Sequence, residues 1–459
     1  MNRKWVIVCM LAAGLAVVSS AVHAKGRVTP VTHSAAPALI PGTRTEMNTA
    51  GFWIGIHPFP DRVILDGPSI REMNAAIRSD LKILYDLRSF PASLPGADIV
   101  RALERDLSSL RLRPLYSSAG KRMDSSTVSA ARANMAPATV PAEIRVQFGF
   151  VIRSSQQRAL PSTTGLYLAR SNQDFDRLQV SVLDAGTPLA ILHTSRDGRW
   201  YYVTAPHGEG WVESDAVSLC PFPSLRDYLA RPEFIVVTAV KADIFLDPKL
   251  TSYKDRIRMG MRLPLLQETG DNVEVLLPSR GQDGQCSFVS GFIRKKDVHR
   301  GYLPYTPRNI ILQAFEFLNE PYGWGDLNGE QDCSTFIRNV FATVGIELPR
   351  NSLFQSRTGR PMHPLEKEGM EGDKGSLLAL RGIGGITLLR MKGHIMLYLG
   401  SANGVPYAIH AIWGYRQKDK RREVTRVVNR VVVTSLSLGK GTRAGSFLDR
   451  IDTTRVMER

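Results

Sequence analysis

Between residues 144 and 302, short apolar runs alternate with polar positions and are separated by turn residues. A period of two is typical of half-buried β-strands, and regularly spaced turns favour small barrels. The segments 187–217 and 261–298 share an apolar strand, a turn at Asp-Gly or Gly-Asp, a second strand, and the endings "GWVESDAV" and "GFIRKKDV". We therefore predict two copies of one small β-barrel, at 144–222 and 223–302, against the alternative of a chance similarity between hairpins.

Upstream of the barrels, apolar residues recur at helical spacing. Ser69 and Glu72 have the spacing of a capping box, which marks a helix start. The residues that follow form one apolar face: Ile70, Met73, Ile77, Leu81 and Leu84. A second helix is predicted over about 98–112, so residues 48–143 are expected to form a mostly helical region. Residues 25–47, rich in Pro, Thr and Ala without periodicity, are expected to be a flexible leader.

Downstream of the barrels, from residue 303 to 459, helical and strand patterns mix. Helices are predicted at 307–319 and 333–344, and strands at about 385–399 and 406–413. The second helix carries a single apolar stripe: Phe336, Ile337, Val340, Phe341 and Val344. The chain is therefore expected to be an α+β protein of several domains.

The first 24 residues have the layout of a secretory signal peptide. Basic Arg3 and Lys4 precede an apolar stretch, and Val22-His23-Ala24 offers a cleavage site after Ala24. The alternative is a retained membrane anchor. No later segment reaches the roughly 20 apolar residues that cross a bilayer. We therefore expect an exported, soluble chain with no integral membrane segment in its mature form.

Export changes how the cysteines are interpreted. Cys9 would leave with the signal peptide, so Cys220, Cys286 and Cys333 remain. An odd number of cysteines in an oxidising compartment leaves at least one thiol free. A disulfide between Cys220 and Cys286 and a pair of free buried thiols are both open, and Cys333 is the odd one out beside that pair.

The net charge of +16 suits an anionic envelope polymer as a partner, and ordinary solubility is the alternative. The basic run "RQKDKRREVTR" at 416–426 is more typical of a solvated face than of a binding patch. No basic segment is organised around a motif that reads nucleic acid, so nucleic acid is not an expected partner.

Cys333 begins a predicted helix, where the helix dipole favours a thiolate. Asp332 is a candidate cap whose charge opposes that thiolate. A nucleophilic cysteine also needs a base, and the base needs an orienting group. His394 and His410 begin or interrupt apolar strands and are candidates for these two roles, although each alone is more typical of a structural histidine. We expect Cys333 to be alkylated by iodoacetamide faster than the other cysteines.

The loop between the two histidine strands decides whether they meet. A two-residue loop at Asn403-Gly404 would put His394 and His410 on opposite faces of the hairpin. A three-residue loop at 402–404 pairs residue 394 with residue 412 and makes the histidines diagonal neighbours on one face. We predict the three-residue loop, because that register permits a Cys–His–His triad.

At this point the sequence resembles a known family. The segments "YGWGDLNGEQDCSTFIRNVFATVGIELPRNS", "GHIMLYLG" and "AIHA" are similar to the NlpC-type cell-wall cysteine peptidases, which have a papain-like fold. The resemblance covers about 303–415 closely, and its five motifs in order are specific where each alone is weak. A helical region followed by two SH3-like barrels is also similar to multi-domain members that trim murein stem peptides. The expected architecture is then two SH3-like barrels ahead of a catalytic domain at 303–459.

The resemblance implies hydrolysis of the bond between γ-D-glutamate and a diamino acid in peptidoglycan peptides, through a thioester acyl-enzyme and without a metal or other cofactor. Cys333 would be the nucleophile, His394 the base, and His410 the group that orients the base. Tyr322 would support the oxyanion together with the backbone N–H of Cys333. Murein peptides or peptidoglycan are then the expected partners, and the periplasm or another part of the cell envelope the expected location.

The family also implies roles in substrate binding. Asp332 and Ser334 would hold the D-glutamyl portion of the peptide. Members with two barrels select a free N-terminal L-alanine, and Asn351 and Ser352 are the candidates for binding its amine. An acidic residue would suit an ammonium group better than Asn351 does.

Thr335 and Asp326 stand where the family usually has glycine, and either is expected to narrow the cleft. Two alternative functions stay open: a catalytically inert wall-binding protein, and a thiol amidase or acyltransferase that acts on another envelope substrate. A zinc hydrolase is disfavoured because the His and Cys residues lack the short paired spacing of a zinc site.

Overall fold

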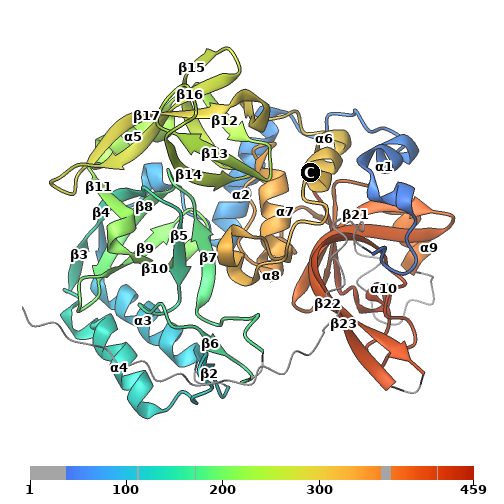
Figure 1. The fold of residues 1–459 in the computed structure, drawn as a ribbon, viewed down its shortest axis with the longest axis horizontal. Helices are drawn as coiled ribbons and strands as arrows, with labels where there is room; N and C mark the ends of the chain where they lie inside the picture. Colours follow the sequence, from blue (N-terminus) through green and yellow to red (C-terminus); the bar gives the residue numbers. More distant parts are fainter. Residues whose placement is uncertain (1–37, 111–112, 171, 363–373, 421, 459) are drawn as a thin grey trace, which may run out of the picture. The chain divides into compact units, whose positions relative to one another are not determined.

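Three large sheets carry the fold of the computed structural model, which describes residues 38–110, 113–170, 172–362, 374–420 and 422–458. Two of these sheets have seven strands and the third has six within the described residues. In Figure 1 the first two sheets run from teal to yellow and the third is orange to red. Helices accompany the sheets, which confirms the predicted α+β class. The predicted signal peptide and residues 25–37 of the predicted leader lie outside the described residues. For the rest of the leader the prediction of flexibility is wrong, because Ile40 and Met47 are buried in the core around the six-stranded sheet.

The first seven-stranded sheet, called barrel 1 below, occupies residues 147–220. One side of the sheet buries Val151, Leu189, Val203 and Val212. The residues next to them in the strands are equally buried, but they belong to a second core that includes residues of α3 (Gly96–Leu110) and α4 (Ser125–Met135): Phe150, Ala190, Tyr202 and Trp211. In spatial order its strands are β11 (Val217–Cys220), β4 (Gln147–Val151), β8 (Pro188–Thr194), β9 (Trp200–Ala205), β10 (Gly208–Glu213), β5 (Ser155–Arg158) and β7 (Gln179–Leu183).

The second seven-stranded sheet, called barrel 2, occupies residues 234–300. On its central strand β16, Val273, Val275 and Leu277 are buried while the residues between them are less so. In spatial order the strands are β14 (Tyr253–Arg258), β13 (Lys241–Phe245), β17 (Cys286–Arg294), β16 (Asn272–Arg280), β15 (Arg262–Thr269), β12 (Phe234–Val237) and β18 (Val298–Arg300). Helix α5 (Phe222–Ala230) connects the two barrels.

The two barrels end in the same way, as the sequence repeat predicts. In barrel 1, β10 leads through the 3-10 turn η4 (Ser214–Ala216) into β11, and in barrel 2, β17 leads through η5 (Lys295–Asp297) into β18. The similar endings "GWVESDAV" and "GFIRKKDV" therefore form the same structure in both barrels, a strand followed by a 3-10 turn and a second strand. The domain boundaries themselves stay a prediction.

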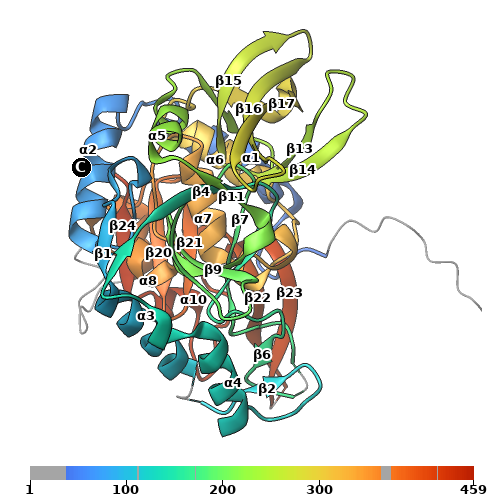
Figure 2. The same cartoon turned by 90° about the vertical axis from the view of Figure 1, so that its left-hand side faces the viewer.

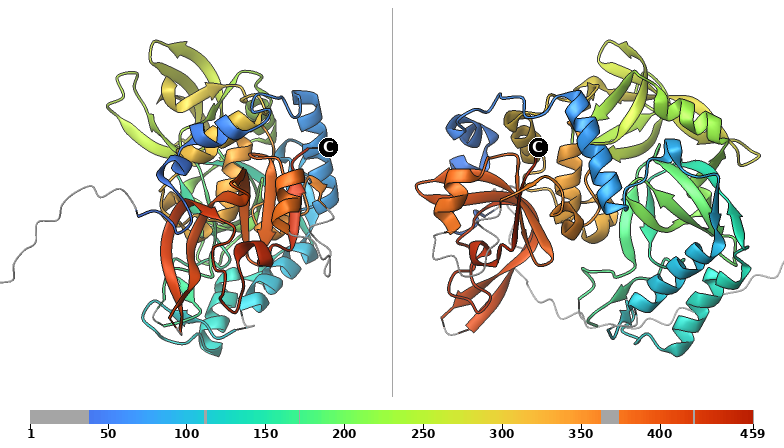
Figure 3. Two further views of the ribbon diagram at one scale, coloured as in Figure 1. Left: turned by 90° about the vertical axis from the view of Figure 1, so that its right-hand side faces the viewer. Right: turned by 180° about the vertical axis from the view of Figure 1, so that it is seen from behind.

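The helices before barrel 1 contribute to two different cores. Apolar residues of α1 and α2 join the core around the six-stranded sheet, whereas those of α3 and α4 join a core shared with barrel 1 (Figures 2 and 3). Their bounds are α1 (Ala50–Ile56), α2 (Gly67–Leu81), α3 (Gly96–Leu110) and α4 (Ser125–Met135). Short elements in the region are η1 (Thr45–Asn48), η2 (Leu87–Ser89), β1 (Ser93–Pro95), β2 (Tyr116–Ser117), η3 (Pro137–Thr139), β3 (Glu143–Arg145) and β6 (Leu166–Tyr167).

The predicted capping box at Ser69 is wrong. The helix begins at Gly67, and the carboxylate of Asp66 caps it by accepting the backbone N–H of Ser69 at 2.9 Å. Aspartate is as good a cap as serine, and Pro68 fits the first turn because it lacks the N–H that a helix start leaves unbonded. The predicted apolar face is confirmed at Ile70, Met73 and Ile77, which are buried.

The six-stranded sheet carries the C-terminal region, with helix α7 packed against its strands β21 and β22 (Figure 1). Its strands in spatial order are β19 (Arg360–Pro361), β24 (Thr453–Val456), β20 (Thr387–Met391), β21 (His394–Ala402), β22 (Val405–Asp419) and β23 (Arg422–Ser435). The helical elements are α6 (Pro307–Glu316), η6 (Trp324–Gly329), α7 (Cys333–Ala342), α8 (Ser352–Gln355), α9 (Lys374–Arg381) and α10 (Phe447–Arg450). The apolar stripe predicted for α7 is buried in this core.

Candidate active site

Cys333 is the first residue of α7, as predicted. The Asp332 carboxylate caps the helix through one oxygen, Oδ1, which accepts the backbone N–H groups of Ser334 at 3.1 Å and Thr335 at 2.9 Å. The apolar stripe of α7 holds the helix against β21 and β22, so the thiol is fixed at the edge of the core with 8% of the residue exposed. Of the described cysteines, all three are free thiols.

The two histidines lie side by side at the hairpin β21–β22. His394 Nε2 and His410 Nδ1 are 2.6 Å apart, and His410 Nε2 lies 2.9 Å from Thr434 Oγ1 on β23. His410 and Thr434 are both fully buried. A continuous hydrogen-bond chain therefore runs from Thr434 through His410 to His394. Sequence reasoning missed Thr434, whose signal was a hydroxyl residue within the buried run of β23.

The prediction of a three-residue loop is wrong, but the prediction that His394 and His410 lie on the same face of the hairpin is confirmed. Ala402 pairs with Val405, which leaves Asn403 and Gly404 as a two-residue loop with φ of 51° and 75°. A bulge between Tyr398 and Gly400 then shifts the register by one residue, so that Leu397 pairs with Ile409. Continued to the start of β21, this register puts residue 394 opposite residue 412. The two-residue loop alone would put His394 and His410 on opposite faces of the hairpin, and the extra residue in the bulge, Leu399, returns them to the same face.

The ionisation of the site differs from the expectation of a low-pKa thiolate. Burial, with a contribution from Asp332, raises the pKa of Cys333 to about 12, although the backbone N–H groups of Ile395 and Ser334 and the charge of Arg350 act in the other direction. Burial and Arg450 lower the pKa of His394 to about 4. The resting pair is therefore a neutral thiol and a neutral imidazole. The N–H of Ile395 also places the sulfur beside the start of β21, one residue from His394.

Tyr322 lies near the thiol. Burial, followed by the charges of Cys333 and Asp332, raises the pKa of the Tyr322 phenol far above its usual value. The phenol therefore keeps its proton and can act only as a hydrogen-bond donor to a developing negative charge. Its backbone N–H donates to Asn429 on β23 at 3.1 Å, which ties the loop before α7 to the sheet.

The residues predicted to bind substrate make many internal contacts. Arg350 binds both carboxylate oxygens of Asp332, at 3.2 and 2.9 Å, and donates to Ser334 Oγ at 3.0 Å. Asn351 is exposed and caps α8 by accepting the backbone N–H of Phe354 at 3.0 Å, while Ser352 is the first residue of α8. Sequence reasoning missed Arg350 as a partner of Asp332, although it stands in the quoted "LPR" motif.

A connection in barrel 1 lies on the rim of this site. The ring of Phe175 contacts Trp324 and Trp413, each with ring centroids 5.3 Å apart, and Trp413 donates to the exposed Asp174 carboxylate at 2.9 Å. Trp324 follows Tyr322 by two residues, and Trp413 follows His410 by three. The segment between β6 and β7 therefore borders both the loop of Tyr322 and the strand of His410, a contact that sequence reasoning missed.

The two residues that replace the expected glycines bind each other rather than narrow a cleft. Thr335 Oγ1 donates to Asp326 Oδ1 at 2.5 Å, and both residues are fully buried. Within the described residues, no group of three or more His, Cys, Asp or Glu side chains is placed to hold a metal ion. None of the helices that the structure describes has the length and apolar character of a bilayer-spanning segment.

Comparison with known families gives two matches along the chain. Residues 319–417 match the model of the NlpC/P60 family, and residues 166–213 match that of the SH3 domain of SH3b1 type. The first range contains Tyr322, Cys333, His394 and His410, and the second lies within barrel 1.

Two curated relatives share part of the chain. A gamma-D-glutamyl-L-lysine dipeptidyl-peptidase of Bacillus cereus is 31% identical over 180 residues, which is 37% of this chain and 48% of the relative. The bifunctional muramidase/DL-endopeptidase CwlT of Bacillus subtilis is 28% identical over 121 residues, 26% of this chain and 34% of the relative. The chain thus spans about half or less of the length of these relatives. A solved NlpC/P60 endopeptidase from Photobacterium damselae subsp. piscicida superposes with a TM-score of 0.72 at 20% identity, covering 92% of this chain and 99% of that one, which shows a shared fold.

Proposed function

We propose that this chain, a multi-domain member of the NlpC/P60 family, is a cell-wall peptidase that hydrolyses the bond between γ-D-glutamate and a diamino acid in peptidoglycan peptides. The observation that carries the proposal is the chain Thr434–His410–His394, which ends beside a buried cysteine at a helix start. The names of the two relatives support a substrate of this class. Export to the periplasm or another part of the envelope belongs to the same proposal, because the substrate lies there.

The hydrogen-bond chain supports one assignment of protons. A proton on His410 Nε2 donates to Thr434 Oγ1, which leaves His410 Nδ1 free to accept a proton from His394 Nε2. His394 Nδ1 is then unprotonated and is the nitrogen available as a base. His410 and Thr434 are therefore positioning residues, and His394 is the group that exchanges a proton with Cys333.

The neutral resting pair implies that proton transfer accompanies attack. As the sulfur of Cys333 bonds to the γ-carbonyl carbon of D-glutamate, His394 Nδ1 takes the thiol proton. The protonated His394 then gives that proton to the leaving amine of the diamino acid, and the C–N bond breaks to leave a thioester. Water, deprotonated by His394, attacks the thioester and releases the D-glutamyl product and the thiol. The Tyr322 hydroxyl and the Cys333 backbone N–H donate to the oxyanion in both steps.

A preference for peptides with a free N-terminal L-alanine is the finer part of the proposal. Asn351, where an acid would suit an ammonium, is occupied as a helix cap. The exposed carboxylate of Asp174 in barrel 1 supplies the missing negative charge at the rim of the site, and Phe175 adds an apolar surface for a small side chain. We therefore assign recognition of the amine to Asp174, with Asp332 and Ser334 on the D-glutamyl side.

The test is digestion of L-Ala-γ-D-Glu-meso-diaminopimelate beside its N-acetylated form, with products identified by mass spectrometry. Release of L-Ala-D-Glu from the free peptide alone supports the full proposal, and Asp174→Asn should narrow the difference between the two peptides. Cleavage of both peptides keeps the reaction but refutes the amine preference. Cleavage of neither by the wild type refutes the proposed substrate and favours an inert wall-binding protein or a thiol enzyme with another envelope substrate. Cys333→Ala should abolish turnover and leave binding to peptidoglycan unchanged.

A further inference from the structure

Asp326 is a fully buried carboxylate in the loop that precedes the catalytic helix. It lies in η6 with φ of 67°, a left-handed conformation that aspartate tolerates better than most residues other than glycine. Burial opposes its ionisation, but Arg350, Arg258 and Arg338 outweigh burial and lower the pKa of Asp326. A buried charge of this kind needs partners on all sides.

The partners come from four separate parts of the chain. Oδ1 accepts Thr335 Oγ1 of α7 at 2.5 Å and Arg350 at 3.1 Å. Oδ2 accepts Ser181 Oγ of β7 in barrel 1 at 2.8 Å and pairs with Arg258 of β14 in barrel 2 at 3.1 Å. One carboxylate therefore joins both barrels to the catalytic helix and to Arg350, in the segment between α7 and α8.

Two arginines extend the network in opposite directions. Arg258 also binds the carboxylate of Asp184 in barrel 1, through Nε at 3.0 Å and a terminal nitrogen at 2.9 Å. Arg350 also binds both oxygens of Asp332, the cap of α7. The path is Asp184–Arg258–Asp326–Arg350–Asp332, and it ends one residue before Cys333.

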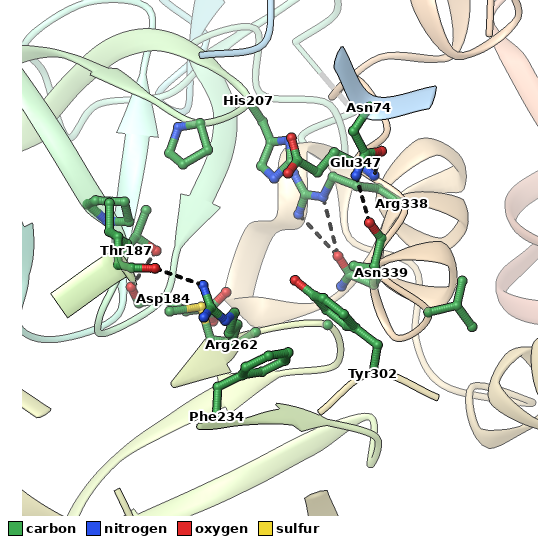
Figure 4. A pocket seen from close by; sticks show the side chains of 18 of the residues that line it. Asn74, Asp184, Thr187, His207, Phe234, Arg262, Tyr302, Arg338, Asn339 and Glu347 are labelled. Atoms are coloured by element: carbon green, nitrogen blue, oxygen red, sulfur yellow. Dashed lines mark hydrogen bonds between the residues drawn. The ribbon is translucent and has the colours of Figure 1, made fainter. Parts of the chain in front are cut away.

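Barrel 2 also touches α7 directly. Gly260, with φ of 84°, sits so close that a Cβ there would lie 2.6 Å from the Cβ of Ala342 and 3.0 Å from the carbonyl oxygen of Asn339. Figure 4 shows Asp184 and Arg262 on the barrel side facing Arg338 and Asn339 across a pocket of about 870 Å³. Barrel 2 therefore packs against the C-terminal end of α7, whereas the proposed nucleophile, Cys333, lies at its N-terminal end.

We propose that Arg258 of barrel 2 is a positioning residue for the reaction, and that it acts through Asp326 and Arg350 to fix the Asp332 cap and thereby the thiol of Cys333. Arg258 and Arg350 pair with opposite oxygens of Asp326, so rotation of either guanidinium would break a buried ion pair of this network. A displacement of about 1 Å in a reacting group lowers rates by orders of magnitude. Barrel 2 then contributes to catalysis by positioning Cys333, in addition to any role in binding the cell wall.

The chain offers a matched control in Arg262. This arginine belongs to the same barrel and lines the same pocket, yet its terminal nitrogens donate to the backbone carbonyls of Leu229 and Arg231 and its guanidinium lies over the ring of Phe234 at 4.2 Å. No carboxylate ion pair is formed by Arg262 among the described residues. Loss of Arg262 removes a comparable side chain without touching the path to Cys333.

The experiment compares Arg258→Met, Arg258→Lys and Arg262→Met in the full-length protein, each checked by circular dichroism and thermal unfolding. For the proposed peptide substrate, we expect Arg258→Met to lower kcat at least about tenfold with little change in KM. Arg258→Lys should recover part of kcat because it keeps the charge, and Arg262→Met should match the wild type. Arg258→Met and Asp326→Asn should be non-additive, with the double variant close to the worse single variant.

A second readout separates this inference from the proposed function, on which it rests. The rate and pH dependence of Cys333 alkylation by iodoacetamide need no substrate, and they should change in Arg258→Met but not in Arg262→Met. If alkylation changes in Arg258→Met but the wild type does not hydrolyse the peptide, the proposed substrate is refuted and the positioning role of Arg258 is supported. A folded Arg258→Met with wild-type kcat and alkylation, additive effects, or an equal loss in Arg262→Met would overturn it. If Arg258→Met does not fold, Arg258→Lys is judged by the same criteria.

Discussion

In the proposed mechanism, the hydroxyl of Thr434 decides which nitrogen of each histidine carries a proton, and Thr434→Val is the change that tests this. Valine has nearly the same shape, so packing is kept while the acceptor for His410 Nε2 is lost. Both residues are fully buried, so bulk water cannot replace the hydroxyl without rearrangement. His410 would then avoid an unpaired buried N–H by carrying its proton on Nδ1. That proton would donate to His394 Nε2 and force the His394 proton onto Nδ1, the nitrogen that accepts the thiol proton in the proposed mechanism.

The magnitude follows from the cost of a buried donor without a partner, which is about 1–3 kcal/mol. If this is the free energy that the hydroxyl contributes to the productive tautomer, kcat should fall by about 5-fold to 150-fold. KM should change little, because Thr434 lies behind both histidines and does not line the substrate side. The free energy of unfolding should fall by no more than about the same 1–3 kcal/mol, less if the tautomers switch.

The assay is steady-state hydrolysis of the tripeptide, with thermal unfolding to confirm that each variant is folded. Thr434→Ser keeps the hydroxyl and should stay within about threefold of the wild type. A folded Thr434→Val with wild-type kcat would show that the tautomer assignment is wrong. An equal loss in both variants would instead assign the effect to the missing methyl group and its packing.

Three further predictions concern the titrating groups and thiols. Burial lowers the pKa of His394 to about 4 and that of His410 well below its usual value. Below about pH 6.5 the unfolded chain therefore binds more protons than the folded chain. The free energy of unfolding, measured by urea titration, should decrease as the pH falls from about 6.5 toward 4 and be constant above that range. A free energy of unfolding that does not change over this interval would contradict neutral buried histidines. The hydrogen bond with Cys220 lowers the pKa of the half-buried Cys286, whereas burial raises that of Cys333 to about 12. Iodoacetamide at neutral pH should therefore label Cys286 before Cys333, the reverse of the order expected from the helix position alone, and peptide mass spectrometry would show the order. In the mature chain, which lacks Cys9, a mild disulfide oxidant should join Cys220 to Cys286 and leave one titratable thiol after denaturation, whereas Cys286→Ser should retain both of its thiols.

The parts of the site that could be predicted depend on neighbours in sequence. The start of α7 at Cys333 follows from Asp332, because a cap acts on backbone groups two and three residues away. The apolar stripe of the same helix follows from its period. The ionisation of Cys333 could not be predicted in this way, because burial depends on the barrels and the sheet and outweighs the local helix dipole.

The hairpin shows how a correct outcome can rest on a wrong local cause. The turn residues Asn403 and Gly404 favour a two-residue loop, and that is the loop that forms. The facing of the histidines then depends on the bulge between Tyr398 and Gly400, where the extra Leu399 is buried like any strand residue. The apolar pattern alone gives no sign of the shift, because an apolar residue in a bulge looks like one in a regular strand. The local signal is Gly400, which has φ of 134° and stands alone inside the strand, where a glycine often marks a bulge.

Asp326 and Thr335 show why departures from a family pattern should be weighed in pairs. Each alone predicts a side chain in place of glycine and a narrower cleft, but together they satisfy each other inside the protein. Arg258 lies 68 residues before Asp326, so its part in the same network has no local signal. Restoring glycine at 326 would leave the guanidinium groups of Arg258 and Arg350 without a shared carboxylate, a loss that costs about 3–5 kcal/mol for a buried ion pair. A glycine at 326 would therefore destabilise this chain, because the Asp326 side chain in the loop before Cys333 also binds both barrels.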